Sequence, residues 1–560
     1  MSALRVLIVG GYGTFGGRLA RLLADESRLT LIVAGRSLRQ AEQFCVALPA
    51  KATLIPAAFD REGDIDAQLD ALVPDLVVDA SGPFQVYGDP YRVVRAAIAR
   101  RIGYLDLADG ADFVQGIAQF DAQARERSVF VLAGASSFPV LTAAVVRRLA
   151  RGTTRVDAVS AGIAPSPFAG LGLNVIRAIA SYCGKPVELL RDGRKAAGFG
   201  LTESRRVTVA PPGRLPLVSR RFSLVDAPDL RVLPALWPLR EVWMGAGTVP
   251  ELMHRVLNLF AWAVRLRLLP SLLPFGRLMH WAANRLRWGE HRGGMYVEVQ
   301  GVREGKPTAR SVTCSWHMIA EGDDGPFIPA MACAAIIQNC LAGKPPVAGA
   351  RPATGDVALE DYERLFALRA IHTGTREILP DTTPLYRRLL GDAYDALPAP
   401  LQEMHDLRDR MSAEGTATVT RGGSRLARLA AALVGFPRAG ENVPVRVDFT
   451  REDGRERWTR TFAGRSFHST QEPGSGRCEW LVCERFGPLC IGMALVLEGD
   501  RLRLIVRRCS VFGVPFPLWL APRGNAHEHA EDGRFHYHVE ISHPFTGLIV
   551  GYRGWLVPGV

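Results

Sequence analysis

The chain has 560 residues, of which 48% are hydrophobic and 22% are charged, and its formal net charge is +12. This composition is typical of a globular protein, and the length predicts roughly three or four domains. The cations are spread along the sequence without a basic stripe, which argues against nucleic acid as a partner. The nine cysteines include no C-x-x-C pair, so neither a zinc ribbon nor a disulfide scaffold is expected, and the protein is predicted to be cytoplasmic.

The chain opens with the pattern of a strand, a glycine turn and a helix. The apolar run 4–9 predicts a buried parallel strand, and 18–24 has helical spacing. Between them lies a G-x-G-x-x-G fingerprint, in which the glycines allow a tight turn, a close approach to a pyrophosphate and close helix packing. The cofactor-binding residues expected in this turn are Gly11, Gly13, Thr14, Phe15 and Gly16.

The second strand, 29–34, decides which dinucleotide is expected. It is followed by Arg36 and Ser37, and no acidic residue stands at its tip. Arg36 can pair with a 2′-phosphorylated adenosine and Ser37 can donate a hydrogen bond to that phosphate, so the sequence favours NADP over NAD. Two alternatives stay open, namely an ordinary surface arginine and a relic fold without a cofactor.

Strands and helices alternate up to residue 136, which predicts an α/β fold with a doubly wound (Rossmann) parallel sheet as an NADP-binding domain, 1–136. The further strands expected are 52–60, 76–79, 104–107 and 129–133, and the further helices are 39–48, 64–72, 87–101 and 113–127.

Two strand exits carry the other candidate site residues. A rigid turn after the fourth strand is expected to form a wall of the cofactor or substrate site, and its residues are Ser81, Gly82, Pro83 and Phe84. Past the fifth strand, Asp106 and Asp109 are candidate acid–base groups, although capping or solvation is the commoner use of such residues.

These motifs together resemble the saccharopine dehydrogenase/reductase-like family. The resemblance is carried by the glycine turn, Ala34 to Ser37, Ala80 to Phe84 and Tyr104 to Leu107, and it covers about residues 4 to 370. It implies an NADP-binding domain, an α+β substrate domain over 137–372, and a helix near 329–341 that returns to the first domain. The family is diverse, so the resemblance does not identify a substrate.

The second region is expected to hold a mixed sheet. A strand is predicted at 156–164, and a hairpin is formed by 295–302 and 311–318 around 305–307. Beyond the return helix, a surface connection is expected from 352–356 and a short helix at 359–368.

Residues 249–288 are strongly apolar but interrupted by arginines and a proline, so a membrane span is disfavoured. The first alternative is a pair of buried helices or a subunit contact, as in a homodimer. The second is an interfacial membrane contact, because aromatic residues and leucine mixed with arginine are typical of such helices. The second alternative would place the protein at the inner face of the membrane.

After a linker near 368–374, residues 376–560 are expected to form an antiparallel β-rich domain. Motifs such as Val419 to Gly422 and Gly551 to Leu556 resemble an uncharacterised bacterial domain family (DUF4166-like) that carries no assigned activity. Four histidines lie at 527, 529, 536 and 538, and His536 and His538 share one face of an expected strand. A metal site there is one interpretation, but Glu528 and Asp532 could equally form a solvated loop, and no metal is predicted. The strands expected are 443–448, 456–462, 477–486, 490–498, 501–509, 534–541 and 547–555.

The leading functional hypothesis is an NADP(H)-dependent oxidoreductase. Hydride would pass between the nicotinamide and an imine, C=O or C=C bond of a small or lipid-like substrate held between the first two domains. The alternative is a non-catalytic, NADP-binding scaffold that associates with membrane or lipid.

Overall fold

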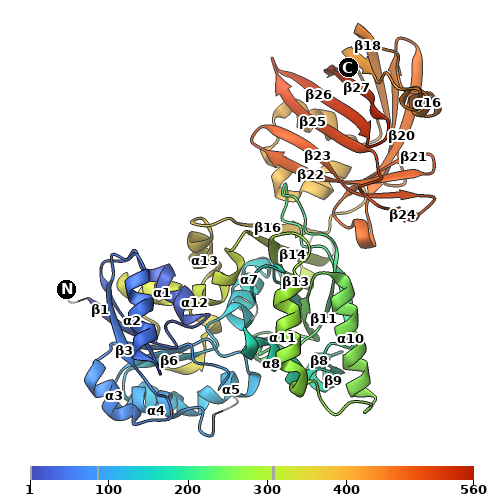
Figure 1. Cartoon of the computed structure of the whole chain (residues 1–560). Helices are drawn as coiled ribbons and strands as arrows, with labels where there is room; N and C mark the ends of the chain where they lie inside the picture. The colour runs from blue at the N-terminus through green and yellow to red at the C-terminus, as the bar shows by residue number, and fades with distance from the viewer. Residues whose placement is uncertain (1–2, 85–86, 171, 305–309, 560) are drawn as a thin grey trace. The chain divides into compact units, whose positions relative to one another are not determined.

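The computed structural model describes residues 3–84, 87–170, 172–304 and 310–559. Its contacts divide the chain into two compact units. Unit 1 comprises 1–205, 221–313 and 320–371, and unit 2 comprises 206–220, 314–319 and 372–560. Each unit is described by itself below (Figure 1).

A parallel sheet with the order β15-β6-β5-β4-β1-β2-β3 begins unit 1. This is the expected doubly wound arrangement, with β1 at the point where the strand order reverses. The sequence analysis missed β15, since a surface connection was expected close by. The strands are β1 (Leu4–Val9), β2 (Leu29–Gly35), β3 (Thr53–Ala58), β4 (Leu76–Asp79), β5 (Gly103–Asp106), β6 (Phe130–Ala133) and β15 (Gly349–Pro352).

Helices cover both faces of this sheet: α3 and α4 lie on one side and α1 and α12 on the other (Figure 1). The expected return helix is α12, which packs against α1. The expected helix 113–127 is wrong in one respect, because a 3-10 turn at 117–120 divides it into α5 and α6. The helices are α1 (Gly16–Leu23), α2 (Leu38–Ala47), α3 (Ile65–Leu72), α4 (Arg92–Ala99), α5 (Ala111–Gly116), α6 (Asp121–Glu126) and α12 (Ile328–Leu341).

A second, mixed sheet has the order β10-β11-β12-β7-β13-β14-β16. The predicted strand at 156–164 and both hairpin strands are present in it, while the expected turn at 305–307 lies outside the described residues. The linker expected near 368–374 is wrong, because strand β16 begins within it. The strands are β7 (Arg155–Ala164), β10 (Ser204–Val207), β11 (Arg220–Leu224), β12 (Glu241–Gly247), β13 (Arg292–Arg303), β14 (Arg310–Glu321) and β16 (Ile371–Glu377).

The remaining elements of unit 1 surround this second sheet. Helix α7 packs against β13, and β8 pairs with β9 in a separate hairpin. They are α7 (Thr142–Leu149), α8 (Leu173–Tyr182), β8 (Pro186–Arg191), β9 (Arg194–Phe199), α9 (Asp229–Leu236), α10 (Glu251–Arg265), α11 (Gly276–Arg285) and α13 (Leu359–Phe366).

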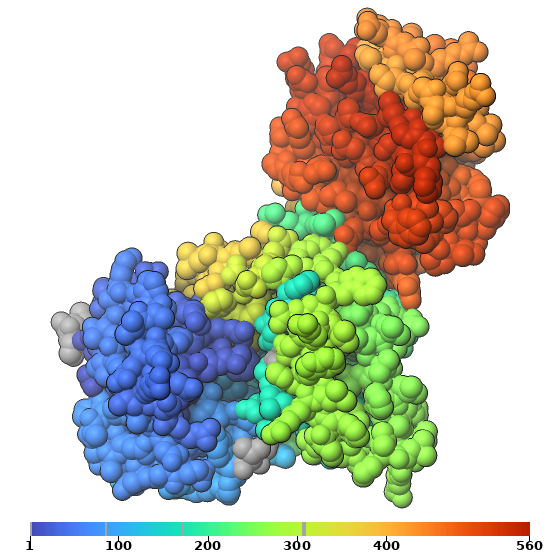
Figure 2. Space-filling model, viewed as in Figure 1, coloured from blue at the N-terminus to red at the C-terminus, as the bar shows by residue number. Residues whose placement is uncertain are grey.

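Helix α10 has buried polar side chains and exposed apolar ones, the reverse of the arrangement in an ordinary surface helix. Two of its polar side chains face the protein: buried His254 hydrogen-bonds Ser223 Oγ through Nε2 (2.7 Å), and Asn258 Nδ2 donates to Leu201 O (2.6 Å). Its large apolar side chains are exposed instead, as are those of α11, so the interpretation of a buried helix pair is wrong. Figure 2 shows the green segment that contains both helices at the surface of the molecule. The exposed apolar residues of this face are Leu252, Val256, Leu259, Phe260, Trp262, Leu266, Leu268, Leu273, Phe275, Leu278, Trp281, Leu286 and Trp288.

Within the described residues, no helix combines the length and the apolar character that crossing a membrane requires.

Unit 2 contains an antiparallel sheet with the order β22-β21-β20-β19-β18-β17-β27-β26-β25-β23-β24. Because β22 also pairs with β23, ten of these strands close into a barrel and β24 continues from its edge. Four strands were missed by the sequence analysis, namely β17, β20, β24 and β25. The strands are β17 (Arg410–Arg421), β18 (Gly440–Glu452), β19 (Arg455–Phe462), β20 (Arg465–Pro473), β21 (Val482–Phe486), β22 (Leu489–Glu498), β23 (Arg501–Val511), β24 (Val514–Phe516), β25 (Arg523–Glu531), β26 (Arg534–His543) and β27 (Gly547–Pro558).

Three helices accompany the barrel: α14 (Leu385–Leu390), α15 (Ala399–His405) and α16 (Arg425–Val434). Helix α15 packs against β25 and β26, and α14 packs against β20. The barrel core continues into α14 and α15 through buried Leu389, Leu390, Leu401 and Met404.

Candidate functional site

The glycine turn between β1 and α1 has no room for side chains at the three glycines of the fingerprint, Gly11, Gly13 and Gly16. A Cβ at Gly16 would lie 2.3 Å from Gly10 O, and one at Gly11 would lie 2.8 Å from Ile8 O. A Cβ at Gly13 would lie 3.0 Å from Gly10 O, so this glycine serves the turn itself. The fingerprint therefore builds a compact turn that brings backbone N–H groups to the start of α1.

Two of these N–H groups are available to a ligand. The backbone N–H groups of Thr14 and Phe15 donate to no acceptor within the described part of the chain. Gly13 and Thr14 are exposed, and the first turn of α1 carries no acidic residue. A helix N-terminus with free N–H groups favours an anion, so the turn can accept phosphate oxygens.

Tyr12, which the sequence analysis did not single out, connects this turn to the tip of β2. Its hydroxyl accepts a hydrogen bond from Ser37 N (3.0 Å), and its ring covers Gly35, where a Cβ would lie 2.6 Å from ring atoms. Ser37 also caps α2, since its Oγ accepts from Gln40 N. Arg36 lies between Gly35 and Ser37, which both contact Tyr12, so its backbone is fixed relative to the glycine turn.

The side chain of Arg36 is exposed and makes no hydrogen bond or ion pair with any residue that the structure describes. An unpaired guanidinium at this point can form a bidentate contact with a phosphate. In the described structure, neither the Arg36 guanidinium nor the Ser37 hydroxyl group donates a hydrogen bond to another residue. Both donors are therefore available for the expected contact with a 2′-phosphate.

At the exit of β4, a buried ion pair supports the turn expected to form a wall. Arg61, which no sequence signal distinguished from other arginines, pairs with Asp79, and Ser81 N and Oγ donate to Asp79 Oδ1 at 3.0 and 2.5 Å. Tyr87 fixes the same turn by donating to Ser81 O (2.8 Å). This network holds the backbone of Ser81 and Gly82 at the carboxyl edge of the sheet.

The side chain of Phe84 has a different place from the one expected. It is buried and stacks on Phe113, with ring centroids 4.5 Å apart, so it contributes to the core. The other three residues of the turn, Ser81, Gly82 and Pro83, are partly exposed. The carbonyl of Gly82 accepts a hydrogen bond from Asn174 Nδ2 in α8 (3.4 Å). Gly172, just before α8, lies beside the glycine turn, since its Cβ would be 3.8 Å from Thr14 Oγ1.

Asp106 is fully buried at the end of β5. Its Oδ1 accepts hydrogen bonds from Gly134 N (2.7 Å) and Ala108 N (2.9 Å), which join the exits of β5 and β6. Burial raises the pKa of this carboxyl group to about 7, against the lowering effect of the two backbone hydrogen bonds. A carboxyl group without solvent access reaches no substrate, so the expected acid–base role is corrected to a positioning role.

The raised pKa of Asp106 predicts a pH-dependent stability. A group whose pKa is raised by folding stabilises the fold fully below its unfolded pKa and loses this effect as pH rises to about 7. Between pH 4 and 7, wild type should therefore lose up to about 4 kcal/mol of unfolding free energy relative to Asp106→Asn. Urea unfolding followed by circular dichroism measures this, with Asp25→Asn at an exposed site as control. Parallel pH profiles of wild type and Asp106→Asn would contradict it.

Asp109 is exposed in the loop after β5 and is therefore accessible to a substrate. At the end of α8, the pKa of the Tyr182 hydroxyl is raised first by burial and then by the charges of Asp226 and Asp109.

The four histidines of unit 2 lie on the paired strands β25 and β26, and the latter was expected at 534–541. Glu528 lies within β25, so the alternative of a solvated loop is wrong for this residue. His527 faces His538 and His529 faces His536 across the pair. Three groups could hold a metal ion together: His529, Glu531 and His536 offer ligand atoms within 4.8 Å of one another. Glu531 is exposed and contacts both imidazoles, at 3.5 and 3.8 Å.

Unit 1 thus has the strand order and the glycine turn of dinucleotide-binding α/β proteins. In unit 2, the family model "Domain of unknown function (DUF4166)" matches residues 397–556, which confirms the resemblance stated for this region. The comparison with curated proteins finds no match.

Solved structures that resemble the chain include several dehydrogenases. A probable dehydrogenase from Thermotoga maritima is 11% identical, covering 65% of this chain and 94% of that one with a TM-score of 0.30. A dehydrogenase from Clostridium difficile is 7% identical (65% and 98% covered, TM-score 0.29). The WlbA dehydrogenase from Thermus thermophilus, in complex with NAD and alpha-ketoglutarate, is 12% identical (66% and 93% covered, TM-score 0.27). These values are too low to bear on activity.

Proposed function

We propose that unit 1 is an NADP(H)-dependent oxidoreductase of the saccharopine dehydrogenase/reductase-like kind. The observation that carries the proposal is the exposed, unpaired guanidinium of Arg36 after β2, where NAD-binding relatives of this fold would present a carboxylate. The free N–H groups of Thr14 and Phe15 support it, because they offer donors to the pyrophosphate.

The proposed reaction transfers hydride between the nicotinamide and an imine, C=O or C=C bond of a small or lipid-like substrate. The bound cofactor supplies the hydride chemistry. The protein would hold the nicotinamide against the turn at Ser81 and Gly82, which the Asp79–Arg61 pair fixes in place. Asp109 is the proposed proton-transfer group, because it is exposed in the loop after the neighbouring strand β5.

Titration with NADPH and with NADH, followed by intrinsic fluorescence, tests the proposal. We expect NADPH to bind more tightly, and NADPH to be oxidised with some member of a panel of apolar carbonyl and enoyl compounds. Binding of neither nucleotide would overturn the proposal. NADPH binding without oxidation of the nucleotide by any substrate would favour the non-catalytic scaffold.

A second proposal concerns the exposed face of α10 and α11: we propose that it contacts an anionic lipid surface. Residues 252–289 contain six arginines and no acidic residue. Arg277, Arg285 and Arg287 form no ion pair within the described residues. Exposed leucines and tryptophans mixed with unpaired arginines combine apolar burial with attraction to anionic headgroups.

Replacing Leu259 (69% exposed) and Trp281 (59% exposed) together by Ser should reduce co-sedimentation with phosphatidylglycerol vesicles about tenfold or more. The reason is that each side chain would lose its burial in the interface. Leu368→Ser with Val46→Ser, two exposed positions elsewhere in unit 1, is the control and should bind as wild type. Unchanged vesicle binding with a dimer that dissociates in the variant would instead assign this face to a subunit contact.

A further inference from the structure

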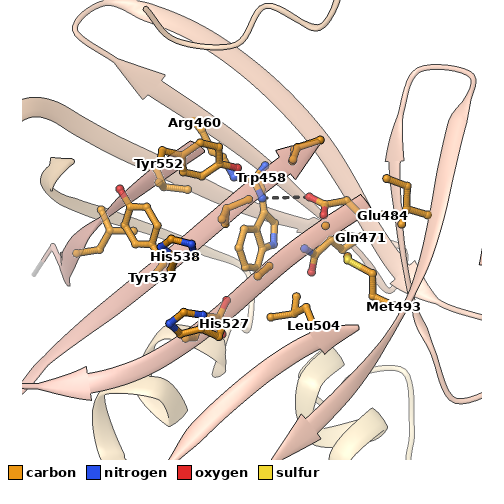
Figure 3. A pocket seen from close by; sticks show the side chains of 18 of the residues that line it. Trp458, Arg460, Gln471, Glu484, Met493, Leu504, His527, Tyr537, His538 and Tyr552 are labelled. Carbon is orange, nitrogen blue, oxygen red and sulfur yellow. Dashed lines mark hydrogen bonds and ion pairs between the residues drawn. The ribbon is translucent and has the colours of Figure 1, made fainter. Parts of the chain in front are cut away.

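The closed barrel of unit 2 surrounds a cavity of about 130 Å³. Its wall is mainly apolar, with side chains such as Val447, Met493, Leu504 and Val539 drawn from strands around the ring (Figure 3). Well-packed interiors leave few voids larger than a water molecule. An apolar cavity of about 150 Å³ is large enough to bind benzene, so this space matches a ligand of similar size.

The helices α14 and α15 supply part of this wall through Tyr386 and Met404. The Tyr386 ring stacks on His405, with centroids 3.7 Å apart, and His405 Nε2 lies 2.7 Å from Glu528 Oε2 on β25. Both partners are buried, so a tight side-chain network joins the helices to the barrel. The cavity is therefore bounded by fixed groups.

Apart from histidine, the described side chains that line the cavity include one arginine and two glutamates, namely Arg460, Glu484 and Glu528. Arg460 Nη2 donates to Glu484 Oε1 (3.1 Å) (Figure 3), and Ser469 bridges the same pair. Glu528 Oε2 lies 2.7 Å from His405 Nε2. The Arg460 guanidinium is therefore already paired, and burying an unpaired charge is costly.

Three buried polar atoms of the lining have no hydrogen-bond partner in the described structure. They are the hydroxyl groups of Tyr386 and Tyr537, which are 0% and 8% exposed, and Oε1 of Gln471, which is 1% exposed. Buried polar atoms are usually satisfied. Because Oε1 only accepts while a phenol can donate, a ligand hydroxyl group can donate to Gln471 or accept from a tyrosine.

We propose that the barrel cavity binds a small, uncharged, apolar alcohol. The apolar wall takes the hydrocarbon part, the unpartnered Tyr537 hydroxyl takes the hydroxyl group of the ligand, and the Arg460 guanidinium is already paired with Glu484. The proposal is independent of nucleotide binding by unit 1.

The test is isothermal titration of the full-length protein with three six-carbon probes: 1-hexanol, hexanoate and hexylamine. We expect hexanol to bind at least about tenfold more tightly than either charged probe, because only the charged probes bury an unpaired charge. Tyr537→Phe keeps the shape of the side chain and should weaken hexanol binding about fivefold. Tyr394→Phe, at a buried tyrosine outside the cavity, is the matched control and should bind hexanol as wild type does.

A cavity-filling variant, Leu504→Trp, should abolish hexanol binding. Circular dichroism of each variant establishes that it is folded. Equal affinity for hexanol and hexanoate would overturn the proposed selectivity. No detectable hexanol binding by wild type, or unchanged binding by folded Tyr537→Phe and Leu504→Trp, would overturn the site itself.

Discussion

Replacing Arg36 by Asp is expected to weaken NADPH binding about 100-fold, because a charge-assisted contact with the 2′-phosphate is replaced by repulsion. NADH affinity should change little or increase, since a carboxylate at the tip of β2 suits a ribose 2′-hydroxyl. Arg36 makes no contact within the described structure that its removal would break, so the fold should be unaffected. Fluorescence titration with both nucleotides measures the ratio of the two affinities.

Arg127→Asp is the matched control for this experiment. Arg127 is exposed and precedes β6, at the opposite edge of the sheet from the carboxyl ends of the strands. The Arg127→Asp substitution makes the same change of net charge as Arg36→Asp and should leave the affinities for NADPH and NADH as in wild type. If Arg36→Asp weakens NADPH and NADH equally, Arg36 does not read the 2′-phosphate; if it affects neither, the NADP proposal fails.

Replacing Gly16 by Ala is expected to lower the unfolding free energy of unit 1 by about 3 kcal/mol and to weaken NADPH binding more than tenfold. The added Cβ would lie 2.3 Å from Gly10 O and 2.9 Å from Gly11 Cα. Both neighbours are backbone atoms, so the turn itself must move and its free N–H groups move with it. Urea unfolding and NADPH titration measure the two effects.

Gly355→Ala serves as the control, because a Cβ there meets no atom within 4 Å and the backbone needs no positive φ. It should leave stability and binding close to wild type. A folded Gly16→Ala protein with unchanged NADPH affinity would show that the turn adapts and that its geometry does not define the site.

The first sheet was predictable to a large degree because of how parallel strands are buried. Strands covered on both faces appear as short apolar runs between turns, and β1, β2, β4 and β6 have this pattern. Strand β15 was not predicted, because it contains only Gly-Ala-Arg-Pro and is defined by its pairing with β6. Its place in the sheet depends on a partner more than 200 residues away in sequence.

The barrel was harder to predict for a related reason. Strand β20 turns Phe467, Ser469 and Gln471 into the buried interior, so polar and apolar residues do not alternate as in an ordinary half-buried strand. Strand β25 carries three charged or histidine residues in succession at its centre, which resembles a solvated loop. Closure itself depends on the pairing of the first and last strands, β17 and β27, which makes an enclosed cavity from what the sequence shows only as consecutive hairpins.

The sequence by itself determined the glycine turn, the absence of an acidic residue after β2 and the alternation of elements in unit 1. These features depend on local backbone conformation and on residues close together in the chain. The tertiary structure alone decided that Asp106 is buried and that α10 turns His254 and Asn258 inward. Such outcomes depend on contacts between distant segments, and burial changes the chemistry of a side chain without changing its identity.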